Sequence, residues 1–369
     1  MDQLFSLFPI ERIARGRGRG GVDDEDFDMS LLPLEITEDV WIEDVSSLVN
    51  DDEFEIYKDQ LGTIAVAHLE RLKYVVIHRF PRNDFDRVAN KIIFEPEQVH
   101  HSERLIQEVV ACLRLIRPTI QYAQFCGGSI AADGKLRGFR FHNPLEFFTP
   151  LENQKFFAIR TRDIEALRLY APLFRQAMVG DFWKYRMAVD MFQSGYFQQS
   201  HWKARYFLWS AALESLFTSQ GKGKAEHSGS LVAKERVKFL LGEDALIYPP
   251  GELITLDPST LLTVAEAIDE IYCLRNHIAH GDKLPNYYYQ ATGRISFENA
   301  QIPKVDVLLE AISSIIRQCL LTILRKDLLS HFRDAQSSES YFSAVGLTKS
   351  GITKHLKVNG KTTSYPCPK

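Results

Sequence analysis

Arg275, Asn276 and His280 form a short polar group whose residue types suit chemistry on a phosphate ester. The planar guanidinium of an arginine can bind two phosphate oxygens at once. An imidazole titrates near neutral pH, so a histidine can exchange a proton with a hydroxyl group. Positioning and charge stabilisation can supply most of phosphoryl transfer without a metal ion. A second interpretation stays open, in which a core helix carries one ion-paired arginine and a histidine that suits its C-terminal dipole.

The segment that carries these residues, 261–278, is predicted to be one amphipathic helix. Thr260 or Asp257 could supply its start signal, and Gly281 is a natural stop. Arg275 falls in the middle of the apolar stripe, where a permanent charge needs a carboxylate, a phosphate or several carbonyl groups. The stripe consists of Leu261, Val264, Ile268, Ile271, Leu274 and Ile278.

Helical geometry separates Arg275 from His280. Five residues at about 100° each place the two side chains about 140° apart on a regular helix. They can share one site only if the last turn loosens at Gly281, or if a second copy of the helix supplies the partner. Asn276 and His277 add polar groups on the far side of the same helix.

Two further predicted helices offer supporting residues. The segment 198–217 carries an aromatic stripe typical of a core helix, and Glu214 lies on its flank as the candidate carboxylate for Arg275. In the helix 231–241, Arg236 is either a second phosphate contact or one member of an intrahelical ion pair. The tyrosines at 287–289 either stack on nucleic-acid bases or cover the bundle.

The pattern Arg275-Asn276-x-x-x-His280 at the end of a long helix resembles the motif of the HEPN superfamily. Two other blocks, 205–217 and 234–241, resemble core helices of the Apea-like branch of that superfamily. The resemblance covers roughly residues 160–335 and implies an all-α, HEPN-like helical bundle.

The resemblance also implies a function, because many HEPN proteins are metal-independent endoribonucleases of antiviral defence or toxin systems. It implies a homodimer in which two motifs meet in one cleft, with RNA as the substrate and no cofactor. His280 would be the acid/base group, Arg275 the phosphate clamp, and Asn276 a residue that orients one of them or the phosphate. The motif defines no role for His277. Other HEPN domains are inactive modules that bind RNA, nucleotides or proteins, so that alternative stays open.

The length of 369 residues predicts two domains with flexible ends. Residues 1–30, with an arginine-glycine run followed by four acidic residues, are expected to be a flexible leader. Residues 31–152 are expected to be an α+β domain, 153–335 the helical domain and 336–369 a polar, basic tail.

The α+β prediction depends on a few local patterns. Strands are predicted at 40–42, 73–78 and 92–94, and a helix at 96–116. Asp133-Gly134 predicts a hairpin between segments 128–130 and 139–141.

The composition limits the remaining possibilities. The net charge of −4 gives no general nucleic-acid-binding surface, so an RNA site would have to be a local basic patch. Five dispersed cysteines without a C-x-x-C pattern indicate a reducing compartment, neither disulfides nor a zinc site, and hence a cytoplasmic location. The apolar segment 305–329 is interrupted by charges and predicts a buried helix, with no membrane span.

Overall fold

The computed structural model describes the strands and helices of the chain and several of their connections. The described residues are 3–10, 31–37, 40–44, 74–81, 96–117, 123–130, 136–145, 160–197, 202–219, 229–247, 262–297, 300–348 and 351–352. The predicted strand 92–94, the arginine-glycine run and the Asp133-Gly134 turn lie outside them.

Contacts divide the chain into two compact units, each with its own elements. The first unit comprises Met1–Phe147 and Asn153–Arg175, and the second comprises Phe148–Glu152 and Gln176–Lys369. Most of helix α5 (Thr161–Val179) therefore belongs with the first unit, whereas the sequence suggested a domain boundary at residue 152.

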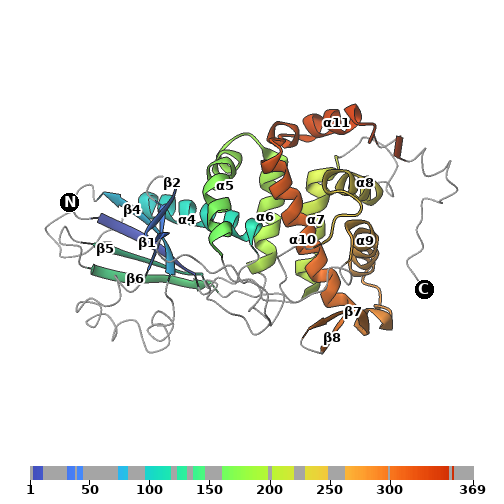
Figure 1. Cartoon of the computed structure of the whole chain (residues 1–369), viewed down its shortest axis with the longest axis horizontal. Coiled ribbons are helices and arrows are strands. Elements are labelled where there is room, and N and C mark those ends of the chain that lie inside the picture. The colour runs from blue at the N-terminus through green and yellow to red at the C-terminus, as the bar shows by residue number, and fades with distance from the viewer. Residues whose placement is uncertain are drawn as a thin grey trace. The chain divides into compact units, whose positions relative to one another are not determined.

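The first unit is built on a six-stranded antiparallel sheet with the order β2-β3-β4-β1-β5-β6. The predicted hairpin is confirmed, because Gly128 pairs with Phe139. Figure 1 shows the strands side by side with helix α4 (Pro96–Ile116) against them. The strands are β1 (Gln3–Ile10), β2 (Leu34–Thr37), β3 (Val40–Asp44), β4 (Tyr74–Pro81), β5 (Ala123–Ile130) and β6 (Leu136–Leu145).

Apolar residues explain why α4 and the sheet pack together. Strand β4 contributes the fully buried Val75, Val76 and Ile77, and α4 packs against β1 and β4. The apolar face of α4 includes the buried residues Ile106 and Leu113. An amphipathic helix that covers a sheet of β-branched residues is the arrangement that an α+β pattern predicts.

Strand β1 corrects the expectation of a flexible leader over residues 1–30. Residues 3–10 form an inner strand that pairs with β4 on one side and with β5 on the other. An inner strand gains hydrogen bonds along both edges, and the apolar residues of Gln3–Ile10 suit such a position. The leader prediction is therefore wrong for this segment.

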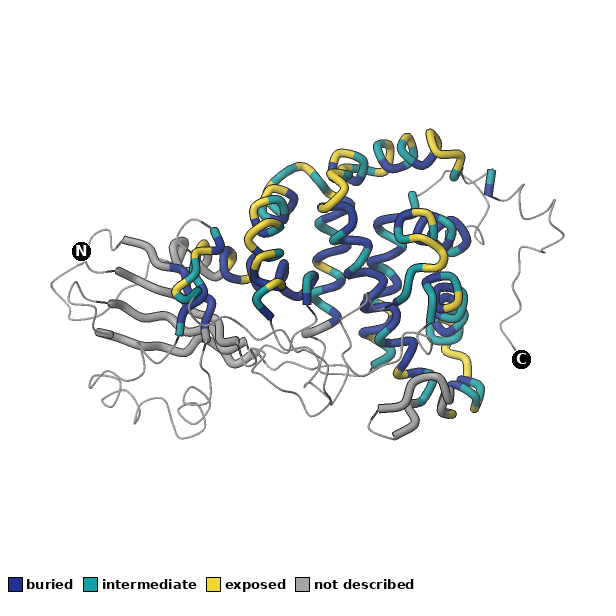
Figure 2. Tube along the Cα trace, in the orientation of Figure 1, coloured by how far each residue is buried: buried dark blue, intermediate teal, exposed yellow. Residues whose placement is uncertain are grey.

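The second unit is a helical bundle around α10 (Lys304–Arg325). The buried colour runs along most of α10 in Figure 2. This helix is long and apolar enough to cross a membrane, yet 83% of its apolar window is buried within the folded chain, as in any core helix. The other α-helices that the structure describes in this unit are α6 (Trp183–Phe197), α7 (Trp202–Phe217), α8 (Gly229–Leu241), α9 (Val264–His280) and α11 (Ala335–Ala344).

Helices α6 and α7 approach closely because one of the facing residues is a glycine. A Cβ atom at Gly195 would lie 2.2 Å from the indole nitrogen of Trp209. That nitrogen donates a hydrogen bond to the carbonyl oxygen of Phe192, 3.0 Å away. The aromatic stripe of α7 is thus core, as its pattern predicts.

Two details of the second unit differ from the sequence-based expectations. The unit is not all-α, since β7 (Ala291–Phe297) and β8 (Ala300–Pro303) form an antiparallel hairpin between α9 and α10. The expected tail at 336–369 is wrong for its first part, because α11 buries Phe342, and Ile352 packs on Leu231 of α8. These apolar side chains give the segment a face that can be buried.

Candidate functional site

Helix α9 has well-formed caps at both ends. Its N-cap is Thr263, which exchanges side-chain and backbone hydrogen bonds with Glu266 in a capping box. The predicted start at Thr260 or Asp257 is therefore wrong. The predicted stop is confirmed, because Gly281 has a left-handed backbone with φ of 69°.

The C-terminal turn of α9 is closed, so it does not loosen at Gly281. The backbone N–H of Gly281 donates to Ile278, and that of Asp282 donates to His277 over 2.9 Å. These two bonds form a Schellman motif, and α9 stays helical through His280. The last turn is thus not loosened, and within one chain His280 is not brought to Arg275.

Arg275 is held by groups on two helices. Its Nη2 atom lies 3.1 Å from Oε1 and 3.2 Å from Oε2 of Glu214, on α7. Its Nη1 atom donates to Oδ1 of Asn276 over 3.3 Å. The contact predicted between Glu214 and Arg275 is confirmed. Both side chains stay partly accessible, with exposed fractions of 25% for Arg275 and 27% for Glu214.

Two donors beside this ion pair have no acceptor among the described residues. One is Nε of Arg275, and the other is the hydroxyl of Tyr272, a residue that is only 2% exposed. Burial raises the pKa of Tyr272, and the negative charge of Glu214 raises it further against the opposing effect of Arg275. A neutral hydroxyl therefore lies close to the pair. The sequence signal for Tyr272 is its spacing, three residues before Arg275 on one helix face.

The two histidines of α9 lie in different surroundings. His280 is exposed, and within the described part of the chain it has no hydrogen bond or ion pair. His277 is mostly buried, with Nδ1 3.5 Å from Oδ2 of Asp282 and its ring edge-on to Tyr288 at 6.0 Å. The carboxylate of Asp282 is thus near the ring, but neither ring nitrogen of His277 makes a hydrogen bond with a described residue. The structure therefore places His277 as a packed residue that holds the end of α9.

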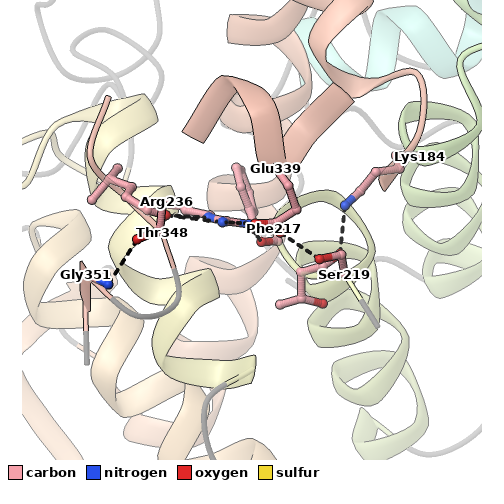
Figure 3. Close-up of polar contacts among 9 residues, drawn as sticks. Lys184, Phe217, Ser219, Arg236, Glu339, Thr348 and Gly351 are labelled. Atoms are coloured by element: carbon pink, nitrogen blue, oxygen red, sulfur yellow. Dashed lines mark hydrogen bonds and ion pairs between the residues drawn. The ribbon is translucent and has the colours of Figure 1, made fainter. Parts of the chain in front are cut away.

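Arg236 proves to be a structural anchor, which corrects both roles considered for it, a phosphate contact and an intrahelical ion pair. Its side chain is fully buried, and its two Nη atoms donate to the two carboxylate oxygens of Glu339, each over 2.7 Å. Its remaining N–H groups donate to the carbonyl oxygens of Phe217 and Leu347. Figure 3 shows Arg236 with Glu339 and Phe217. All five donors of the guanidinium are used. No donor remains for a phosphate.

The predicted site residues do not form one cluster. Arg275 contacts both Glu214 and Asn276, whereas His280 lies apart and Arg236 belongs to the core. Among the residues that the structure describes, no three His, Cys, Asp or Glu side chains gather as a metal site requires. Comparisons of the chain with family models, with curated proteins and with solved structures find no match.

Proposed function

We propose that this protein is a metal-independent endoribonuclease whose site combines Arg275 of one chain with His280 of a second copy. The observation that supports the proposal is the exposure of these two side chains together with their contacts. Arg275 is fixed by Glu214 yet one-quarter exposed, and His280 is exposed on a rigid helix end without a partner in the described part of its own chain. An oriented guanidinium and an accessible imidazole are the groups that phosphodiester cleavage needs.

In the proposed reaction, the ribose 2′-oxygen attacks the adjacent phosphorus, and the bond from phosphorus to the 5′-oxygen breaks. A proton leaves the 2′-hydroxyl and another reaches the 5′-oxygen, so the products are a cyclic phosphate end and a free 5′-hydroxyl. His280 exchanges protons with these oxygens. Arg275 binds the non-bridging phosphate oxygens as negative charge develops, and Glu214 and Asn276 fix its direction.

A second function is favoured by the same ion pair. Glu214 already compensates the charge of Arg275, which suits a module that binds RNA, a nucleotide or a protein without cleaving it. In this case His280 contributes to binding only, and its replacement changes affinity without any product being formed.

The test is cleavage of mixed cellular RNA by the purified full-length chain in excess EDTA. His280→Ala and Arg275→Ala should each slow cleavage about 100-fold or more, because both act in the transition state. Arg275→Lys keeps the charge but loses the planar fork, so it should restore only part of the rate. Cyclic phosphate ends on the products would identify the attack by the 2′-hydroxyl.

Two control variants match the residues tested. Arg325→Ala removes an exposed arginine at the end of α10, and His101→Ala removes an exposed histidine of α4. Both should cleave like the wild type. Equal cleavage by the wild type and by His280→Ala, or no cleavage by a wild type shown to be oligomeric, would reject the nuclease function.

A further inference from the structure

The segment that follows α9 returns the chain to the side of that helix. Residues 282–285 lead from the closed end of α9 into the short 3-10 helix η4 (Asn286–Tyr289). Leu284 in this connection is buried, and Tyr288 in η4 packs its ring against His277. Because His277 is one turn before His280, η4 lies close to the end of α9 that carries His280.

Polar and aromatic contacts fix η4 in place. The rings of Tyr287 and Tyr288 pack at 4.3 Å, and the ammonium group of Lys304 lies 5.0 Å and 5.9 Å from their centres. Lys304 is itself bound to Oε1 of Glu270 on α9 over 2.7 Å. Tyr288 is fully buried as a result. The next residue along the chain is therefore attached to a rigid support.

That next residue, Tyr289, differs from its two neighbours. Its side chain is 55% exposed, and the described residues give it no hydrogen bond, ion pair or ring contact. Lys283, in the connection to η4, is also exposed and has no ion pair within the described chain. An accessible aromatic ring and a free ammonium group thus lie in the segment next to His280, although the carboxylate of Asp282 lies there as well.

We propose that Tyr289 stacks on a base of single-stranded RNA while Lys283 contacts the adjacent phosphate. This inference rests on the proposed function and names its substrate class. Aromatic rings bind single strands because every unpaired base offers a π-face, whereas bases inside a duplex are already stacked. Loops, bulges and unpaired ends are therefore the RNA that this surface selects.

The test measures binding and not cleavage, so that it can fail independently of the nuclease function. His280→Ala protein is titrated with a labelled unstructured RNA, with a hairpin duplex and with an abasic strand of equal length. Adding Tyr289→Ala should weaken binding of the unstructured RNA about 5- to 100-fold, the range found for loss of one stacked base. Binding of the abasic strand should stay the same, since it has no base to stack.

Two further variants keep the result interpretable. Tyr289→Trp preserves a stacking ring, so it should restore affinity, and its indole fluorescence should be quenched by the unstructured RNA but not by the abasic strand. Phe207→Ala removes another exposed aromatic ring, from a residue of α7 that is 45% exposed, and should leave binding unchanged. Circular dichroism and thermal melting check that each variant is folded.

The inference is overturned if Tyr289→Ala binds the unstructured RNA as tightly as its parent does, or if it loses the abasic strand to the same degree. It is also overturned if the parent binds none of the three RNAs. If the wild type does not cleave RNA but binding depends on Tyr289 as described, the nuclease function is rejected and the role of Tyr289 in RNA binding is retained.

Discussion

Two arginine–glutamate pairs in the same bundle differ in how far the arginine is buried and in how many of its donors are bound. Arg236 is fully buried, binds both carboxylate oxygens of Glu339 over 2.7 Å and uses its other donors on carbonyl groups. Arg275 is one-quarter exposed, binds Glu214 at 3.1 Å through one Nη atom, and keeps Nε without an acceptor among the described residues. A buried charge with every donor satisfied stabilises one conformation, whereas a fixed but accessible charge can still bind a ligand.

The comparison assigns Arg236 to the stability of the fold and leaves Arg275 as the candidate for function. Arg236 joins α7, α8, α11 and the segment after it, because its partners lie at Phe217, Glu339 and Leu347. Its hydrogen bonds hold the pKa of Glu339 below the usual value, so the pair contributes stability that is lost only as the pH falls through that lowered pKa. Among the described residues, Arg275 joins α7 to α9 and stays one-quarter exposed.

The largest expected effect is that of Arg236→Ala on stability. The change removes both arginine donors from the Glu339 carboxylate, which keeps the Ser219 hydroxyl at 2.7 Å, and it removes the arginine donors from two carbonyl groups. The free energy of unfolding should fall by about 3 kcal/mol. Urea denaturation followed by circular dichroism measures it, with Arg325→Ala as the control. A loss below about 1 kcal/mol would mean that Arg236 is no more structural than a surface residue.

A second prediction concerns Lys184, which donates to the carbonyl oxygen of Thr218 over 2.7 Å beside the Arg236–Glu339 pair (Figure 3). Burial lowers the pKa of Lys184 to about 8, although Glu339 opposes that shift. Above pH 8 the folded chain therefore releases the proton of Lys184, whereas the unfolded chain keeps it. Lys184 should make the free energy of unfolding rise with pH in this range. Relative to Lys184→Met, the wild type should gain about 2 kcal/mol between pH 7 and 9.5.

The measurement is urea denaturation of both proteins at the two pH values. Tyrosines and other groups titrate alike in both, so the difference between the proteins isolates the lysine. A difference that does not change with pH would show that Lys184 keeps its proton in the folded state, and that the buried region tolerates charge as easily as the Arg275 region does.

A smaller effect is expected at the end of α9. Gly281→Ala places a side chain at φ of 69°, where no atom lies within 4 Å of the added Cβ, so only backbone strain opposes it. The cost should be about 1 kcal/mol. Hydrogen exchange of the Asp282 amide, which closes the turn, should quicken and cleavage should slow. Unchanged exchange together with slower cleavage would argue against a role for the rigid turn.

The smallest effect on stability is expected for Glu214→Gln. A pair that is about one-quarter exposed contributes up to about 1 kcal/mol, so thermal unfolding should shift little. Cleavage should nevertheless fall, since Arg275 loses its fixed direction. A stability loss as large as that of Arg236→Ala would remove the distinction between the two pairs.

Proline, glycine and the spacing of apolar residues predicted where several helices begin and end. The helix α4 begins and ends where Pro96 and Pro118 indicate, and the stop of α9 follows from Gly281. The contact between Glu214 and Arg275 was predictable because Arg275 lies within the apolar stripe of its helix and Glu214 lies on the flank of another, and apolar stripes of neighbouring helices face each other.

The parts that the sequence does not indicate depend on distant pairing. Strand β1 is hydrogen-bonded to β4 and β5, which lie far along the chain, and no local signal specifies such a position. Arg236 and Glu339 are 103 residues apart, so no spacing rule relates them, and neither role considered for Arg236, a phosphate contact or an intrahelical ion pair, includes this partner. A charged residue in a helix has the same local pattern whether its partner is a distant carboxylate or a ligand.

The central claim, that Arg275 and His280 act together across two chains, is tested most directly by mixing two inactive variants. Purified Arg275→Ala and His280→Ala chains are unfolded, refolded together in equal amounts and assayed for RNA cleavage in EDTA. In a two-fold symmetric dimer, half of the dimers would be mixed and each would contain one intact site, so activity should return to about one-quarter of the wild-type value. Activity no higher than that of either variant alone, with mixed dimers shown to be present, would contradict the account.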